Sequence, residues 1–292
     1  FKLLKAYTLA EIDFNESFWM YYEFMERANL HQSDFLPKDK LVKFNEKIGS
    51  PYHVGIGLRY IEHYIGKQVI DKVFKQYLNQ SEKKLTFLSL MKKCSPKDID
   101  WFEKFYLKER LPIDISIKNL NKNKDSIRVR LSKYYDDKIP FELSQVKNDS
   151  IIDQVWIENM GTNLSFNLKN LKPDYVVINP KIRLPESNKN NNWRYTKNFL
   201  NLKPIQFNFL RDYESPKRNQ IYYNPVVNYN LYDGLSLGSR FYDKGLLTQK
   251  FTFELMPQYS TIQKDMVGKV IMSYLINNFS KSNYATSLSF FG

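Results

Sequence analysis

The sequence is poor in the residues that build metal sites and covalent cross-links. Cys94 is its one cysteine, which excludes an intrachain disulfide framework and a cysteine-based zinc knuckle. Histidine occurs only as His31, His53 and His63, and none of the three belongs to an H-E-x-x-H motif. No run of about 18 apolar residues occurs, so the sequence predicts no transmembrane helix.

Acidic residues are outnumbered by basic ones, and the excess is spread along the whole chain. The sequence has 44 Lys+Arg against 31 Asp+Glu, a formal net charge of +13. Such a charge suits anionic surroundings such as nucleic acid or lipid headgroups. No block of five basic residues is present, so a basic nucleic-acid binder, whose binding would depend strongly on salt, is disfavoured and no nucleic-acid partner is predicted.

Residues 1–112 are predicted to form a helical domain. In the stretch from Gly49 to Gly66, apolar residues recur at helical spacing, Pro51 is suited to the position just before a helix, and Gly66 is suited to its end. Ser95-Pro96-Lys97-Asp98 is typical of a helix N-terminus and precedes Trp101 and Phe102. On spacing alone, Tyr52 is a tyrosine packed against its neighbours at a helix start.

From Leu111 the apolar residues recur at every second position, which is typical of strands. Several short alternating segments predict an antiparallel β-sandwich over residues 113–186. Residues 187–219 are rich in Asn and Lys and are predicted to be a linker. The predicted fold class is therefore α+β and multidomain.

Residues 220–292 alternate between aromatic or aliphatic residues and polar ones, in segments of about ten residues. Tyr223, Val227 and Tyr229 share one face of the first segment, and Phe251 and Phe253 share one face of a later segment. Asp233-Gly234 is a turn signal between strands. The pattern favours strands of a transmembrane β-barrel, and a second soluble β-domain is the alternative. About five strands fit, whereas the smallest bacterial barrels have eight, so the barrel is predicted to be incomplete in this sequence.

Three stretches resemble, in order, elements of the gluzincin metallopeptidases related to aminopeptidase N. They are the Pro51-Tyr52 helix up to Gly66, the capped Trp101-Phe102 helix, and the finish of a post-catalytic sandwich, Ile178-Asn179-Pro180 with Pro185-Glu186-Ser187-Asn188. The last third, with Asp233-Gly234 and Met256-Pro257, resembles the barrel half of outer-membrane proteins of the Bacteroidota. The resemblance implies the C-terminal portion of a gluzincin-like protein joined to an outer-membrane barrel.

The resemblance to gluzincins also implies roles for two residues. Tyr52 would hydrogen-bond the oxyanion of the tetrahedral intermediate, and Glu16, in Asn15-Glu16-Ser17, would be the zinc glutamate. Serine replaces the family's glycine after Glu16, and the interval to Tyr52 is shorter than usual. His53 and His63 lie too far apart on one helix to share a metal without a third ligand, and His63 beside Glu62 is predicted to be a solvated face. Gly55 and Gly57 are predicted to allow close helix packing.

These expectations define two hypotheses. The first is a non-catalytic scaffold or accessory subunit of an outer-membrane complex, with no cofactor in this chain and with lipid and other outer-membrane or periplasmic proteins as partners. The alternative is a membrane-tethered zinc metallopeptidase acting on a peptide substrate, whose H-E-x-x-H lies upstream of Phe1. In both, residues 1–219 are periplasmic or surface-exposed.

Overall fold

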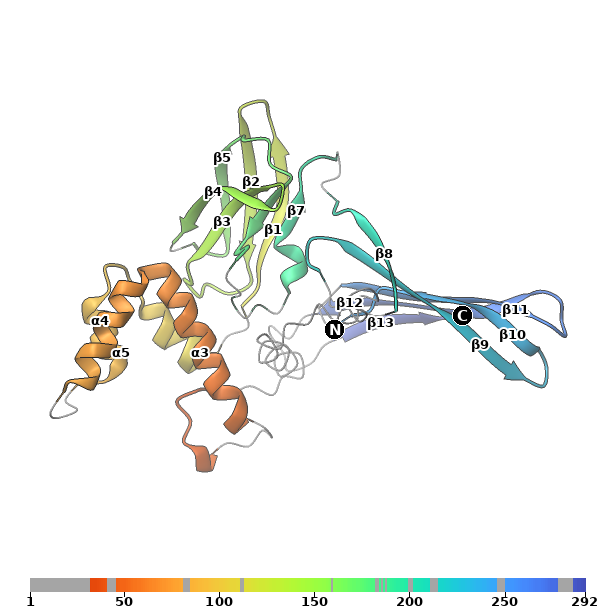
Figure 1. Cartoon of the computed structure of the whole chain (residues 1–292), viewed down its shortest axis with the longest axis horizontal. Coiled ribbons are helices and arrows are strands. Elements are labelled where there is room, and N and C mark those ends of the chain that lie inside the picture. Colours follow the sequence, from red (N-terminus) through yellow and green to blue (C-terminus); the bar gives the residue numbers. More distant parts are fainter. Residues whose placement is uncertain are drawn as a thin grey trace, which may run out of the picture. The chain divides into compact units, whose positions relative to one another are not determined.

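A computed structural model describes residues 32–40, 46–80, 85–110, 113–158, 160–181, 184, 186, 188–198, 202–210, 215–245, 250–277 and 286–292. The chain divides into two compact units, residues 18–187 and residues 188–292 together with 1–17. Each is described by itself (Figure 1). At the level of class the prediction is confirmed, because the chain combines a few helices with several antiparallel sheets. Among the described residues, no helix is long and apolar enough to cross a bilayer.

The helices of residues 18–187 include α3, which contains nearly all of the predicted Gly49–Gly66 stretch. They are η2 (Lys38–Lys40), α3 (Glu46–Ile65), α4 (Lys67–Leu78), α5 (Phe87–Cys94) and the π-helix η3 (Phe102–Glu109). Gly66 ends α3 as predicted, with φ of 97° and its N–H donating to the carbonyl of Glu62 at 2.9 Å. The predicted start is wrong, since Pro51 lies inside α3. Proline removes a single backbone donor there, and the helix continues through it.

Two antiparallel sheets follow the helices, at the predicted positions. Strands β1 (Ile115–Lys122), β2 (Ser126–Lys133) and β5 (Asn163–Lys169) are ordered β1–β2–β5. In the other sheet, β3 (Phe141–Lys147) lies between β4 (Ser150–Ile157) and β6 (Tyr175–Ile178). The buried positions of β2 are Ile127, Val129, Leu131 and Lys133, at the predicted period of two.

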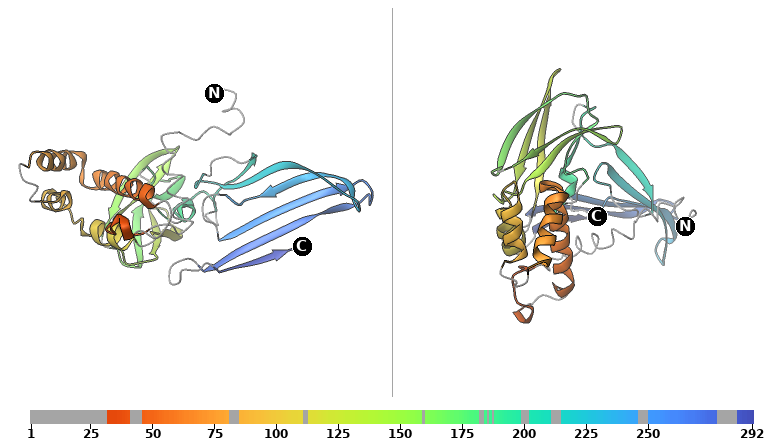
Figure 2. Two further views of the ribbon diagram at one scale, coloured as in Figure 1. Left: turned by 90° about the horizontal axis from the view of Figure 1, so that it is seen from below. Right: turned by 60° about the vertical axis from the view of Figure 1, so that its left-hand side comes forward.

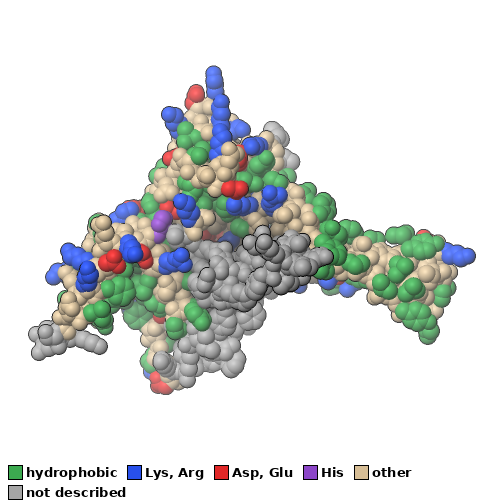
Figure 3. Space-filling model, in the orientation of Figure 1, with side chains coloured by type: hydrophobic (Ala, Val, Ile, Leu, Met, Phe, Trp, Pro, Cys, Tyr) green, Lys and Arg blue, Asp and Glu red, His purple; other side chains and the backbone are tan. Residues whose placement is uncertain are grey.

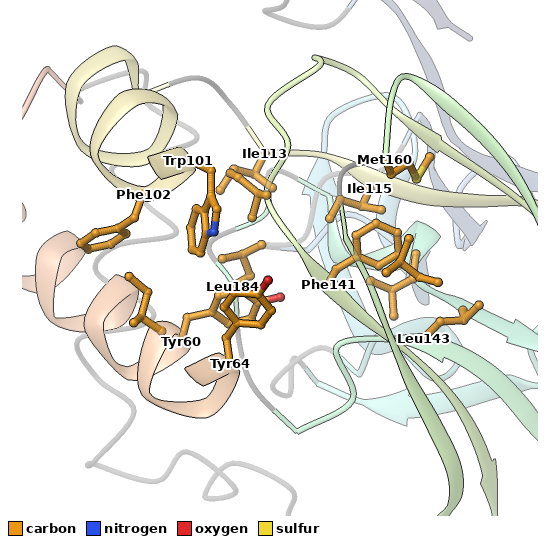
Figure 4. Close-up of a cluster of buried hydrophobic side chains, with 14 of the residues drawn as sticks. Tyr60, Tyr64, Trp101, Phe102, Ile113, Ile115, Phe141, Leu143, Met160 and Leu184 are labelled. Atoms are coloured by element: carbon orange, nitrogen blue, oxygen red, sulfur yellow. The ribbon is translucent and has the colours of Figure 1, made fainter. Parts of the chain in front are cut away.

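One hydrophobic core joins these helices to these sheets. It includes Tyr60 of α3, Trp101 and Phe102 at the start of η3, and Ile115 and Phe141 of the two sheets. Figure 4 shows these side chains between the helices and the strands. The helical part of residues 18–187 and the two sheets therefore share a core instead of forming separate ones.

The other unit contains one large sheet. Its strands are β8 (Ile205–Phe209), β9 (Asn219–Asn230), β10 (Gly234–Tyr242), β11 (Phe251–Ser260), β12 (Met266–Asn277) and β13 (Thr286–Phe291), hydrogen-bonded in that order. β8 pairs in parallel with β9, and the other pairs are antiparallel. Figure 2 shows the blue strands side by side in its left view.

The structure differs from the predictions for residues 187–292 in two respects. Residues 187–219, predicted to be a linker, contain η4 (Lys189–Asn191), β7 (Trp193–Tyr195) and β8. The Asn- and Lys-rich composition did not indicate these strands, because both residue types are depleted in strands. The described strands also form an open sheet with edges β8 and β13, and none of the described sheets closes into a barrel.

The predicted turn at Asp233-Gly234 is confirmed. Gly234 has φ of 66°, and the side-chain oxygen of Asn230 accepts from the N–H groups of Tyr232 and Asp233 at 2.9 and 2.7 Å. The Ser260 hydroxyl of the next tight turn donates to the carbonyl of Asp233 at 2.8 Å. Two tight turns are thus fastened together at one end of the sheet.

Candidate functional site

The predicted site residues fall in different environments. Tyr52 lies in the first half of α3 with 40% of its surface exposed. Glu16 and His31 lie outside the described residues. His53, the neighbour of Tyr52, is buried. The structure therefore leaves the role of Glu16 a prediction and gives Tyr52 an accessible position.

His53 belongs to a buried charged cluster with Asp34 and Arg110. Its Nδ1 lies 2.6 Å from Oδ2 of Asp34, while Nη2 of Arg110 donates to Oδ1 of Asp34 at 3.0 Å and Nε to Oδ2 at 3.2 Å. Nε of Arg110 also lies 3.4 Å from Nδ1 of His53. The short distance to Asp34 requires Nδ1 to carry the hydrogen, so this last contact is not a hydrogen bond. The cluster holds the ring of His53 in one orientation.

Tyr106 fixes the same ring from another side. Its aromatic ring stacks on the His53 ring at 4.0 Å and 6°, and its hydroxyl donates to the carbonyl oxygen of His53 at 2.9 Å. Arg110 follows η3 in the left-handed conformation, φ 48°, which its ion pair with Asp34 stabilises. Together these contacts fasten the loop of Asp34 and the end of η3 to α3.

The three stretches that carry the gluzincin resemblance meet in one set of contacts around the buried Tyr60. We refer to Tyr60, Trp101, Asn179 and Glu186 with their contacts as the joint. The Tyr60 hydroxyl lies 2.9 Å from the carbonyl of Pro140 and 3.0 Å from Oδ1 of Asn179, and it has one hydrogen to share between them. Asn179 Nδ2 donates to Glu186 at 3.4 Å. The ring of Trp101 lies edge-on to that of Tyr60 at 6.4 Å. Burial raises the pKa of Tyr60, and the carboxylates of Glu186 and Glu142 raise it further.

His63 is part of the same joint. Its Nε2 lies 2.7 Å from Oε1 of Glu142, whose side chain is only 2% exposed, and Trp156 lies beside the histidine ring at 5.5 Å. The prediction of a solvated face at His63 is wrong, although the ring is still 31% exposed. The partner comes from β3, 79 positions along the chain, which local sequence cannot indicate.

The large sheet has an apolar face that is open to solvent. Residues that pair across neighbouring strands lie on the same face of a sheet. The register places on one face the side chains of Phe207, Tyr229, Leu237, Tyr259 and Tyr274, and each of them pairs with an apolar residue. Tyr229 is 74% exposed and Phe207 is 64% exposed. Figure 3 shows hydrophobic side chains over the strands that Figure 1 labels β9 to β11.

The opposite face carries most of the polar side chains of the sheet and is better covered. Ser236 and Gln258 are 2% and 6% exposed, and Asn228 Nδ2 donates to Oε1 of Gln258 at 3.0 Å. Arg240 and Glu254 form an ion pair across β10 and β11 at 2.7 Å. A water-soluble sheet shows the reverse arrangement, with its apolar face covered.

Metal ligands do not gather in the described part of the chain, where no group of three or more His, Cys, Asp or Glu side chains could hold an ion. Glu142 of the joint and the cluster residues Asp34 and Arg110 were not singled out from the sequence, and Asn179 and Glu186 were named only within the resemblance, without a role. Asn179 alone carried a local signal, since asparagine tolerates the left-handed conformation it adopts here, φ 49°.

Comparison of the chain with protein-family models, with curated proteins and with solved structures finds no match. The resemblances to gluzincins and to outer-membrane barrels therefore stay predictions, and the functional argument has to rest on the geometry described above.

Proposed function

We propose that this chain is an outer-membrane protein in which strands β9 to β13 form part of a lipid-facing barrel wall. A single observation carries the proposal: the apolar face of the sheet is exposed and the polar face is covered. In a barrel wall, apolar side chains face lipid and polar ones face the lumen. In water, each large apolar side chain left exposed forgoes about 1.5–3 kcal/mol of burial, so a wholly apolar exposed face would be unfavourable.

The lengths of the strands support the same proposal. β9 and β12 have 12 residues and β11 has 10, near the nine to eleven or so that cross a bilayer when tilted. A bilayer also requires every backbone group to be paired, so an open sheet is not a stable membrane structure. The proposal therefore requires further strands, from this polypeptide or from a partner, on the edges at β8 and β13.

The proposed role of residues 18–187 is that of a non-catalytic scaffold or accessory subunit in an outer-membrane complex. The stretches that resemble a peptidase meet in a buried joint of hydrogen bonds and aromatic rings, in which each motif has a structural task. The partners are lipid and other outer-membrane or periplasmic proteins, and residues 1–219 would be periplasmic or surface-exposed.

A membrane-tethered zinc metallopeptidase is the second candidate, and the exposed position of Tyr52 favours it. A hydroxyl that donates to an oxyanion only in the transition state affects turnover more than substrate binding. If the whole protein is a peptidase, Tyr52→Phe lowers kcat by about 10²–10³ with little change in KM. Unchanged turnover in an active enzyme would remove Tyr52 from the site.

Membrane fractionation tests the proposal directly. The chain, produced with an outer-membrane signal sequence in a Gram-negative host, should stay in the membrane fraction after washes with high salt and with alkaline carbonate, and should be released only by detergent. A known peripheral protein in the same sample is the control for the washes. Release of the intact chain by carbonate would overturn the barrel assignment in favour of a second soluble β-domain.

A further inference from the structure

A lysine side chain lies over two aromatic rings where α3 packs against the end of β4. The ammonium of Lys97 lies 4.2 Å from the centroid of the Tyr64 ring and 5.6 Å from that of the Trp156 ring. It also donates to Oε1 of Glu158 at 3.0 Å. We refer to Tyr64, Trp156 and Glu158 as the cage, which belongs with Lys97 to residues 18–187.

The two rings form the walls of a corner. Tyr64 comes from α3 and Trp156 from β4, and their ring centroids are 4.9 Å apart at an angle of 59°. Tyr64 is 6% exposed, and its ring lies 6.5 Å from that of Trp101. The ring of Trp156 lies 6.0 Å from that of Tyr60, and Figure 4 shows Tyr60 and Tyr64 side by side between α3 and the strands. The hydrophobic core therefore holds both walls in place, whichever group lies between them.

Glu158 gives the cage a negative charge at an opening to solvent. Its side chain is 43% exposed and that of Lys97 is 33% exposed, so a small molecule can reach the site. An aromatic face attracts a cation through the quadrupole of the ring, and a carboxylate attracts it through its charge. Two aromatic faces with one carboxylate are therefore a combination that recognises an ammonium group.

Lys97 matches the cage incompletely. A lysine ammonium carries three N–H groups, and in the described structure one of them is accepted, by Glu158. The ring faces attract the charge but offer no lone pair for a hydrogen bond of ordinary geometry. A trimethylammonium group has the same charge and no N–H to satisfy, and aromatic cages bind such groups. The two walls therefore suit a methylated ammonium better than the lysine that occupies them.

The side chain of Lys97 can leave the cage without disturbing the backbone. The N–H of Lys97 donates to the hydroxyl oxygen of Ser95 at 3.2 Å, and that hydroxyl donates to the carbonyl of Lys97 at 2.7 Å. Ser95 thus fixes the turn independently of the ammonium. An exposed lysine–carboxylate pair contributes little to stability because solvent screens it, and the released side chain gains rotamer freedom. Lys97 is therefore an occupant that a ligand can displace.

We propose that the cage binds the trimethylammonium group of a ligand, and that Lys97 occupies the cage when the ligand is absent. The cation lies over the faces of Tyr64 and Trp156, with Glu158 as its counter-charge. Free choline and the headgroup of phosphatidylcholine share this chemistry. The site lies within residues 18–187 and does not depend on the large sheet residing in a membrane.

Lys97→Ala is the informative substitution, because it empties the cage and leaves both walls and the Ser95 turn in place. Lys93→Ala is the matched control: it removes an exposed lysine of α5 that makes no ion pair in the described structure. Glu158→Gln, added to Lys97→Ala, removes the counter-charge from an exposed position. If Lys97→Ala shows no cooperative thermal transition, Lys97→Ser takes its place.

The test titrates the full chain in dodecyl maltoside with choline at constant ionic strength, and measures saturation transfer by NMR from aromatic protons to the N-methyl protons. The uncharged analogue of choline, in which tert-butyl replaces trimethylammonium, controls for apolar contact. Lys97→Ala should bind choline about tenfold more tightly than the natural chain and Lys93→Ala, because the internal competitor is gone, and added Glu158→Gln should reverse this gain. Binding of dihexanoyl phosphatidylcholine well above that of choline identifies a lipid headgroup as the source, and similar binding identifies a free ammonium compound.

Failure of the emptied cage to bind choline would overturn the site, and so would equal binding of the uncharged analogue. Equal affinity of the natural chain and Lys97→Ala would show that choline binds elsewhere. A natural chain that binds no choline, even far above the concentration that saturates Lys97→Ala, would make Lys97 a permanent occupant and overturn the role in ligand binding. Release of the chain by carbonate would count against the membrane assignment alone.

Discussion

Tyr60 and Tyr52 lie about two turns apart on α3 and have opposite environments. Tyr60 is fully buried with its hydroxyl at two acceptors, whereas Tyr52 is 40% exposed. Tyr60→Phe should lower the free energy of unfolding by about 1–3 kcal/mol, because the buried carbonyl of Pro140 loses its donor. Tyr52→Phe should change it by less than about 0.5 kcal/mol.

Urea unfolding followed by tryptophan fluorescence would measure both changes, since the rings of Trp101 and Trp156 lie 6.4 and 6.0 Å from that of Tyr60. Equal, small effects of the two substitutions would show that the joint around Tyr60 adds little to stability.

Lys203 gives a prediction for the pH dependence of stability. Its pKa is about 8 in the folded chain and about 10.5 when unfolded, so the unfolded state binds more protons between these values. Stability therefore rises as pH increases from about 8 toward 10.5, and the unfavourable effect of the charged form is fully present below pH 8. Thermal midpoints between pH 7.5 and 9.5 should rise in the natural chain and rise less in Lys203→Met. Parallel curves for the two proteins would contradict the assignment.

At the scale of the element, α3 contains a matched pair of glycines. A Cβ at Gly57 would lie 2.3 Å from Cε1 of Tyr106 and 2.6 Å from Cε2 of Phe102, whereas one at Gly55 would meet nothing within 4 Å. Tyr106 and Phe102 are both buried and their rings stack at 5.3 Å, so neither can move aside easily. The predicted close packing therefore exists at Gly57 and not at Gly55.

Gly57→Ala should lower the free energy of unfolding by about 1–3 kcal/mol through overpacking. Gly55→Ala should raise it by about 0.5–1 kcal/mol, because alanine is the better helix former at a position with free space. Denaturant unfolding of the two variants checks the pair. Similar changes in both would mean that η3 does not pack on α3 as described.

In the large sheet, Phe253 and Thr252 are neighbours on β11 and point to opposite faces. Phe253 is opposite Met272 on the apolar face, and Thr252 is opposite Ser273 on the polar face. In a barrel wall, Phe253→Arg near the bilayer centre should cost about 2–4 kcal/mol and Thr252→Arg much less. Folding into liposomes over a urea series would measure both. On a soluble sheet with that face in water, Phe253→Arg would be tolerated, so a neutral result speaks against lipid.

Alternation of apolar and polar residues placed most of the strands of both units in the sequence. Strands β1 to β6 occupy the predicted segments, and so do β9 to β11. What the pattern could not provide is pairing between distant residues. The bond from His63 to Glu142, the short strands β7 and β8, and the cluster of Asp34 with Arg110 all depend on contacts between separate parts of the chain.

For the whole molecule, the environments of the histidines bear on whether this chain by itself can hold a zinc ion. A catalytic zinc site has three protein ligands with neutral imidazoles or carboxylates and an open position for water. His53 is held by Asp34 at 2.6 Å and stacked on Tyr106, and His63 is held by Glu142 at 2.7 Å. Neither histidine has a second histidine beside it in the described structure, where no set of three metal ligands occurs.

We therefore expect the purified 292-residue chain to bind no zinc at stoichiometric level. The chain would be dialysed against a chelator, reloaded with a slight excess of zinc, passed through a desalting column and analysed for metal by mass spectrometry. His53→Asn and Glu16→Gln are the diagnostic variants. A tight one-to-one content in the natural chain that either variant removes would show that these residues are ligands and would favour the metallopeptidase. A content near zero in all three proteins is the expected result, because His53 and His63 are held by Asp34 and Glu142 and not by a metal.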